Sequence, residues 1–152
     1  MGRQLSTRMC FVCGFKNPIG LRLIFEDDGV RAWARFSPRP EHQGFPGTLH
    51  GGIISALLDE VMVRSSLAMN PRLWTLTART EVRYLKPVPI GMELTVVGEA
   101  TEVRRRVVKS RGELRLADGE LAAESTGTYI AMPEEMRQAM ESEMREWRVL
   151  EE

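Results

Sequence analysis

The sequence predicts an α+β domain in which a curved, mostly antiparallel sheet surrounds one long helix, and two observations support this prediction. Apolar and polar residues alternate over residues 21–26 and 30–36, and again over four runs within residues 75–131, a period of two that is typical of strands. Between these blocks, residues 51–68 repeat apolar side chains every three or four positions, which indicates an amphipathic helix. Because the four later strands follow one another with short breaks, we expect an antiparallel meander and not a βαβ unit.

The composition is that of one soluble globular domain. The chain has 152 residues, 43% of them hydrophobic and 28% charged, which suffices for one core and is too short for a two-domain enzyme. Its 21 basic and 21 acidic residues balance, so the net charge favours neither a nucleic acid nor a membrane as partner. No run approaches the roughly 18 apolar residues that span a bilayer, and the N-terminus lacks the apolar part of a secretory signal. We therefore expect a cytoplasmic protein.

The chain begins with an irregular segment and a hairpin. Residues 1–20 lack a periodic apolar pattern and contain glycines, a proline and two cysteines, which predicts a packed but irregular N-terminal arm. Strand-like residues 21–26 and 30–36 follow, and the acidic turn at residues 27–29 joins them as a hairpin. Proline and polar residues then predict a loop over residues 37–47.

The central helix and the later strands complete a domain that we expect to span residues 21–131. Asn70 and Pro71 end the helix. The later strands are expected at residues 75–86, 92–103, 106–117 and 120–131. A sheet of about six strands buries the apolar stripe of the helix most economically by curving around it. Such a sheet leaves long edges, which favours pairing of copies into a homodimer or homotetramer.

A helix packed on the domain is expected over residues 132–152. Pro133 suits its first turn. Its apolar stripe consists of Met136, Met140, Met144 and Trp147. Such a stripe suits packing or an oligomer surface better than a cofactor site.

Two adjacent glycines, Gly51 and Gly52, stand where the central helix begins, although glycine is a poor helix former. Free backbone N–H groups at a helix start attract a carbonyl oxygen that gathers negative charge, so these glycines suit an oxyanion hole. They equally suit a plain loop-to-helix junction that needs a positive φ.

Asp59 lies inside the apolar run of the same helix, where an unpaired carboxylate is costly to bury and tends towards a raised pKa. A catalytic base or nucleophile is one interpretation, and a solvated carboxylate or one paired with Arg64 is the other. Asp59 follows Gly51 by eight residues, about 12 Å along the helix and about 80° around it, too far for both to reach one carbonyl. If both act together, a second copy of the chain must supply one of them.

The run PGTLHGGIISALLDE (residues 46–60) resembles the signature of PaaI-type hotdog-fold acyl-CoA thioesterases, in which an acidic residue follows the histidine of H-G-G by nine positions. The run TARTEVRYLKPVPIG (residues 77–91) resembles the third strand of that family and its Tyr-x-x-Pro exit. The resemblance covers most of residues 20–131. It implies a hotdog fold, dimers that often pair into tetramers, and hydrolysis of an acyl-CoA thioester without metal or cofactor.

Residue by residue, the resemblance makes Asp59 the general base or nucleophile and Gly51 the N–H donor to the thioester carbonyl, within a helix start that includes Gly52. His50 would position that carbonyl, and Thr77 would orient the attacking water. One position departs from the family, since Gly44 stands where relatives commonly carry an asparagine.

In place of that asparagine, Gln43 or His42 would hold substrate or water. A non-catalytic module that binds acyl-CoA or a lipid therefore stays open as an alternative, as does a purely structural oligomer.

Arg104, Arg105 and Arg106 lie at a predicted turn, where they would bind the phosphates of coenzyme A or form a solvated sheet edge. Cys10 and Cys13 form a C-x-x-C-G motif that is also half of a zinc knuckle. Zinc needs four ligands, and the chain has no second cysteine pair and only two histidines. We therefore expect two ordinary thiols and no metal.

Overall fold

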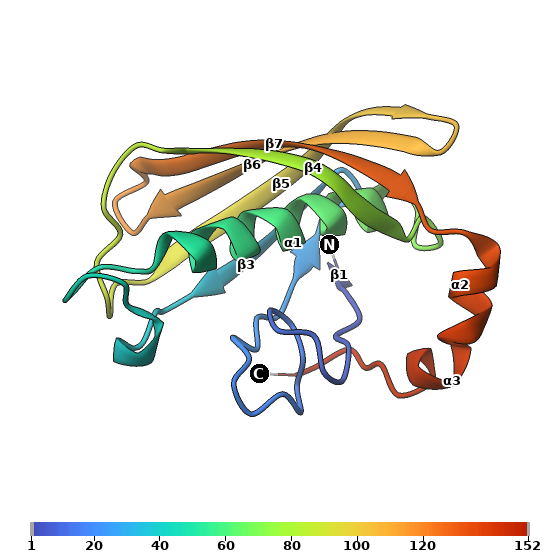
Figure 1. The fold of residues 1–152 in the computed structure, drawn as a ribbon, viewed down its shortest axis with the longest axis horizontal. Helices are drawn as coiled ribbons and strands as arrows, with labels where there is room; N and C mark the ends of the chain where they lie inside the picture. The colour runs from blue at the N-terminus through green and yellow to red at the C-terminus, as the bar shows by residue number, and fades with distance from the viewer. Residues whose placement is uncertain (1, 152) are drawn as a thin grey trace.

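Helix α1 (Gly51–Met69) lies against one face of a curved, seven-stranded antiparallel sheet in the computed structural model, which describes residues 2–151 (Figure 1). In sequence order the strands are β1 (Gly2–Arg3), β2 (Glu26–Asp27), β3 (Arg31–Phe36), β4 (Thr75–Tyr84), β5 (Leu94–Arg104), β6 (Val107–Leu116) and β7 (Leu121–Ala131). In space the order is β1-β2-β3-β5-β6-β7-β4, so β4 forms one edge of the sheet. The predicted α+β hotdog class is confirmed, with seven strands instead of six because the arm contributes β1.

The expected strand over residues 21–26 is present only as β2. Leu21, Leu23 and Phe25 are buried, as their alternation predicted, but the N–H groups of Leu21 and Leu23 donate to the carbonyls of Phe11 and Val12 in the arm. The alternation therefore predicted correctly which side chains are buried. It predicted a strand wrongly, because the backbone here bonds to loop carbonyls of the arm and not to a neighbouring strand.

The single helix expected from Pro133 is instead two short helices, α2 (Glu134–Ala139) and α3 (Glu141–Met144). The chain then returns to the arm, where residues Ser6 and Arg148 form an antiparallel bridge. Trp147 packs edge-on against Trp74 at the start of β4, with the ring centroids 4.8 Å apart. No helix within residues 2–151 has the length and apolar character needed to cross a membrane.

The core lies between α1 and the sheet, as Figure 1 shows. Leu57, Leu58 and Val61 of α1 are fully buried there. Two glycines paired across β5 and β6, Gly98 and Gly112, face the helix and let it approach the sheet closely. A Cβ atom at Gly98 would lie only 2.3 Å from the Val61 carbonyl oxygen.

The substitution Gly98→Ala is expected to lower the free energy of unfolding by about 3 kcal/mol, because the added methyl group meets helix backbone that cannot rotate away. Gly112→Ala is the matched control, since its Cβ would meet the Met62 side chain at 3.1 Å and that side chain can adjust. Urea denaturation of both variants measures the difference. Equal, small losses would show that the sheet gives way as easily as a side chain does.

Candidate active site

Asp59 is the centre of the polar cluster on the sheet-facing side of α1. The hydroxyl of Thr77 on β4 donates to both carboxylate oxygens of Asp59, at 3.0 and 3.1 Å. The hydroxyl of Tyr129 on β7 donates to Oδ1 at 3.0 Å. Thr77 and Tyr129 are direct cross-strand partners, so the β4–β7 register sets both donors against one carboxylate.

The surroundings of Asp59 act on its pKa in opposite directions. Burial raises the pKa of the half-buried Asp59 carboxyl, the hydrogen bonds from Thr77 and Tyr129 lower it, and the charge of Glu60 raises it, with a net rise. Burial, followed by the nearby Asp59 charge, raises the pKa of Tyr129, so its hydroxyl stays a hydrogen-bond donor. The result is a carboxylate with a fixed orientation in a partly dry setting.

His50 forms the N-cap of α1 through its side chain. Its Nδ1 accepts a hydrogen bond from the Gly52 N–H at 2.8 Å. The Gly51 N–H has no hydrogen-bond acceptor among residues 2–151, as expected for the first residue of a helix. Of the N–H groups of Gly51 and Gly52, only that of Gly51 therefore has no acceptor among the described residues and is left to bind a carbonyl oxygen.

The alternative reason for these two glycines does not hold, because neither Gly51 nor Gly52 has a positive φ; in this loop only Gly47 does. A Cβ at Gly52 would lie 3.0 Å from the His50 Nδ1, so the close approach of the capping ring explains that glycine. A Cβ at Gly51 would make ordinary contact with Tyr84, 3.5 Å from its Cε1. Space within the chain thus does not require glycine at position 51.

Tyr84 and Ser55 complete the helix start. Neither had a predicted role in the site, although Tyr84 is the tyrosine of the Tyr-x-x-Pro run. The Tyr84 hydroxyl, at the end of β4, donates to the Gly51 carbonyl at 3.1 Å and lies 2.6 Å from the Ser55 Oγ. Tyr129 was missed as well. A tyrosine on the inward-facing side of a strand was the signal available in the sequence, since a buried hydroxyl needs a partner.

The loop before α1 fixes the groups that flank the asparagine position of the family. The Gln43 Oε1 accepts a hydrogen bond from the Gly47 N–H at 3.0 Å, which leaves the amide nitrogen for other partners. His42 is buried against Phe36, and its Nδ1 accepts from the Arg39 N–H. Burial, and after it the charge of Arg39, lowers the pKa of His42, whose ring is held in the loop by this hydrogen bond.

Gly44 lies directly beside His50. A Cβ atom there would be 3.3 Å from the His50 Cδ2.

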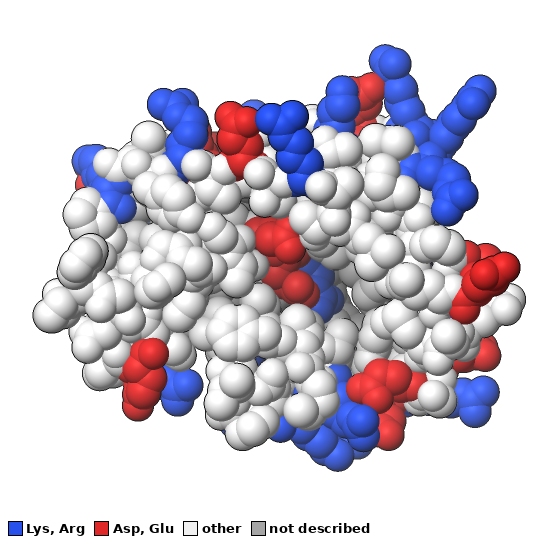
Figure 2. All heavy atoms as spheres, viewed as in Figure 1, with Lys and Arg blue, Asp and Glu red and all other residues white. Residues whose placement is uncertain are grey.

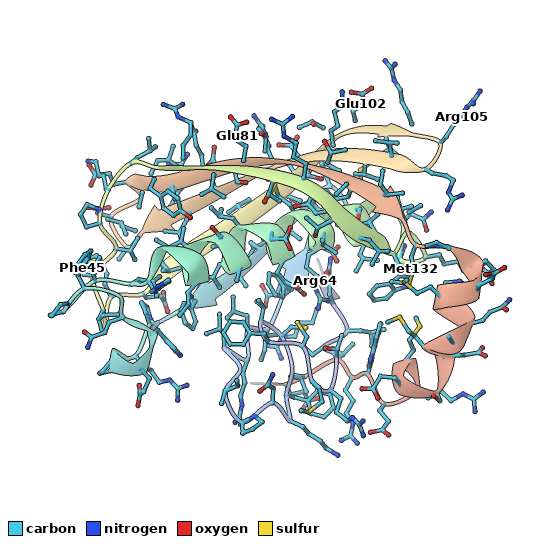
Figure 3. The ribbon with its side chains drawn as sticks, in the orientation of Figure 1. Phe45, Arg64, Glu81, Glu102, Arg105 and Met132 are labelled. Carbon is cyan, nitrogen blue, oxygen red and sulfur yellow. The ribbon has the colours of Figure 1, made fainter. Side chains whose placement is uncertain are left out.

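The predicted residues fall into three separate groups within one chain. Asp59 lies beside Thr77, and Gly51 lies beside Tyr84, seven residues further along β4, about 23 Å in an extended strand. Arg104, Arg105 and Arg106 form a third group at the β5–β6 turn, where Arg104 pairs with Glu102. Figure 2 shows basic side chains gathered over this hairpin, and Figure 3 shows Arg105 pointing away from α1.

Comparisons with known proteins agree with this fold. The acyl-coenzyme A thioesterase THEM4 of Bos taurus is 24% identical over 135 residues, which cover 87% of this chain and 55% of that protein. The solved thioesterase superfamily protein RHA08564 is 29% identical with a TM-score of 0.74, over 82% of this chain and 61% of that one. The chain thus spans little more than half the length of these two relatives.

A Streptococcus mutans protein, smu.793, solved with acetyl CoA bound, has the same fold at 18% identity, with a TM-score of 0.65 over 72% of this chain and 86% of that one. The sequence model of the Thioesterase superfamily matches residues 46–123, just over half of the chain. That match spans the histidine-capped helix start, Asp59 and Thr77. By its sequence and its sheet-wrapped helix, the chain belongs to the thioesterase superfamily.

Proposed function

We propose that the chain is an acyl-CoA thioesterase whose active site is completed by a second copy of itself. The observation that carries this proposal is that one chain contains both functional groups in separate places. The Asp59 carboxylate is oriented and half-buried, and the Gly51 N–H has no acceptor among the described residues. The relatives named acyl-coenzyme A thioesterase and solved with acetyl CoA support the substrate class.

In the proposed reaction, the Gly51 N–H donates to the thioester carbonyl oxygen as it gains negative charge, and His50 lies beside that oxygen. Asp59 takes a proton from a water molecule, and the water oxygen attacks the carbonyl carbon. The tetrahedral intermediate then breaks its carbon–sulfur bond, releasing the coenzyme A thiolate and a carboxylic acid. Direct attack by Asp59, followed by hydrolysis of the acyl-enzyme, uses the same geometry. Thiolate is a good leaving group, so neither route needs a strong general acid to protonate the sulfur.

The edge strand β4 supports the arrangement of two copies. One edge of β4 pairs with β7 and the other has no partner strand among residues 2–151, although the strand is ten residues long. Antiparallel pairing of two β4 strands, centred between Thr80 and Glu81, sets Thr77 of one copy opposite Tyr84 of the other. This register brings the Asp59 group of each copy to the Gly51 group of its partner, twice per dimer.

Exposed apolar side chains lie along the proposed interface, on β4 and in the loop before α1. Leu76 and Tyr84 on β4 are exposed, and Phe45, in the loop before α1, is 84% exposed and points outward in Figure 3. A large apolar group next to the helix start suits either the partner copy or an acyl chain. The exposed Arg105 and Arg106 would bind the phosphates of coenzyme A, since Arg104 is already paired with Glu102.

The two remaining residues of the proposed site are Gln43 in the loop and Gly52 at the helix start. The amide nitrogen of Gln43 would contact the substrate, because its oxygen already serves Gly47. Gly52 would act by letting the His50 ring approach closely.

The proposal is tested by following thiol release from short-chain, medium-chain, long-chain and aromatic acyl-CoA esters, with equilibrium binding of coenzyme A measured in parallel. Saturable turnover of at least one ester is the expected result, and the preferred ester names the acyl class. Saturable binding without turnover would contradict the enzyme and favour an acyl-CoA binding module. The glycine at position 44, where the family commonly has asparagine, would then explain the lack of turnover. If the chain neither binds coenzyme A nor hydrolyses any ester, the structural oligomer is the remaining interpretation.

A further inference from the structure

Cys10, Cys13 and Glu60 form a cluster that the proposed hydrolysis does not use. Their Sγ and carboxylate oxygen atoms all lie within 4.8 Å of one another. The cysteines come from the arm, and Glu60 comes from α1. Glu60 contacts the arm whereas the neighbouring Asp59 contacts β4 and β7, so the two carboxylates serve different sides of the helix.

The tight turn at residues 10–14 fixes the position of the Cys10 sulfur. The N–H groups of Val12 and Cys13 both point at the Cys10 Sγ, at 3.3 and 3.4 Å. The turn closes this tightly only with glycine at position 14, because a Cβ there would lie 2.3 Å from the Cys10 carbonyl oxygen. A metal ion that binds these sulfurs displaces their protons, because the thiolate is the form that ligates a metal.

The separations within the cluster suit a small tetrahedral ion. The Cys10 Sγ lies 3.8 Å from the Glu60 Oε2. In a tetrahedral zinc site, a sulfur and an oxygen ligand are about 3.6 Å apart. Three protein ligands leave the fourth position to water.

Arg64 holds the outer side of the same cluster. Its guanidinium donates to the Glu60 Oε1 at 2.9 Å and to the Cys13 Sγ at 2.9 Å, and the residue is 2% exposed. The other carboxylate oxygen of Glu60 is thereby turned toward Cys10. Figure 3 shows Arg64 beneath α1, at the arm. Such outer hydrogen bonds orient ligands in metal sites.

The charges of the cluster balance around a divalent cation. Two thiolates and one carboxylate carry three negative charges, and the Arg64 guanidinium supplies one positive charge. A divalent ion makes the buried group neutral, which lowers the cost of burying it. Two sulfur ligands select zinc over magnesium or calcium.

We propose that Cys10, Cys13 and Glu60 bind one Zn²⁺ ion per chain, which clips the N-terminal arm onto α1. A redox pair fits the cluster less well. Cys13 is fully buried with its sulfur facing Arg64, so only the half-buried Cys10 is open to an oxidant.

The test uses the 152-residue chain stripped with a chelator and then titrated with Zn²⁺ or Co²⁺. Native mass spectrometry is expected to show one zinc ion per chain, and Co²⁺ to give the absorption of tetrahedral thiolate coordination. Glu60→Gln keeps the shape of the side chain and is expected to weaken zinc binding at least about tenfold. Glu135→Gln, an exposed change on α2, is the matched control and is expected to bind zinc normally.

Thermal unfolding adds a readout that is independent of enzymatic activity. Zinc is expected to raise the Tm of the wild type and of Glu135→Gln more than that of Glu60→Gln or Cys10→Ser. The cobalt spectrum of the unaltered chain tests thiolate ligation even if Cys10→Ser does not fold. Absence of zinc uptake, equal affinity in Glu60→Gln, or one zinc ion shared by two chains would each overturn the proposal.

Discussion

Replacing Asp59 with asparagine is expected to lower kcat for acyl-CoA hydrolysis by at least about a hundredfold, the usual scale for loss of a catalytic base. Asparagine has nearly the same shape and keeps one oxygen to accept the hydrogen bonds of Thr77 and Tyr129. The fold and the oligomeric state should therefore survive while the proton acceptor is lost. Thiol release under saturating substrate measures the effect.

The control for Asp59→Asn is Asp28→Asn, an exposed turn residue that also accepts hydrogen bonds through a carboxylate. This variant removes the same charge far from the site and is expected to keep full activity. Wild-type turnover in Asp59→Asn, with folding and oligomeric state matched, would remove Asp59 from the mechanism.

Replacing Gly51 with proline is expected to lower kcat by about a hundredfold to a thousandfold, because proline lacks the N–H that the proposal assigns to the carbonyl oxygen. Proline is favoured at the first position of a helix. The preceding His50 already has φ −62° and ψ 132°, the extended conformation that a residue before proline adopts. The helix should therefore form normally.

Gly51→Ala is the matched variant, since it adds a side chain and keeps the N–H. Its Cβ would meet Tyr84 at an ordinary contact distance, so kcat is expected to stay close to the wild-type value. Equal activity of the proline and alanine variants would show that this N–H does not act in the reaction.

Mixing the two inactive variants tests whether the site is shared. In a heterodimer of Asp59→Asn and Gly51→Pro chains, one of the two shared sites has both functional groups, so an equal mixture after subunit exchange should recover about a quarter of wild-type activity. If each site lay within one chain, the mixture would stay inactive.

The helix and the four later strands were predictable from the sequence, because each follows from a local pattern of apolar residues. The period of three to four residues located α1, and the alternation located β4 to β7, because both periods reflect which side faces the core. The same reasoning failed at residues 21–25, where the alternation was right about burial and the pairing partner was a loop. Strand pairing depends on the rest of the fold, which a local period does not contain.

The polar contacts of the site depend on register and on distant segments. Tyr129 meets Asp59 because β7 pairs with β4 in one particular register, and sequence alternation does not specify that register. Glu60 meets Cys10 because the arm docks on α1, fifty positions away. Counting only cysteines and histidines could not reveal that Glu60 lies beside the cysteine pair.

The bridge between Ser6 and Arg148 closes a loop that contains almost the whole chain. Because closing so long a loop is favourable only once the sheet and α1 have formed, we expect the arm and the C-terminal segment to dock late in folding. Such segments are expected to open in the native state before the central strands do, which faster hydrogen exchange in both segments would show. The two ends of the chain are thus expected to open together from one side of α1, while the opposite side of the same helix keeps Asp59 against the sheet.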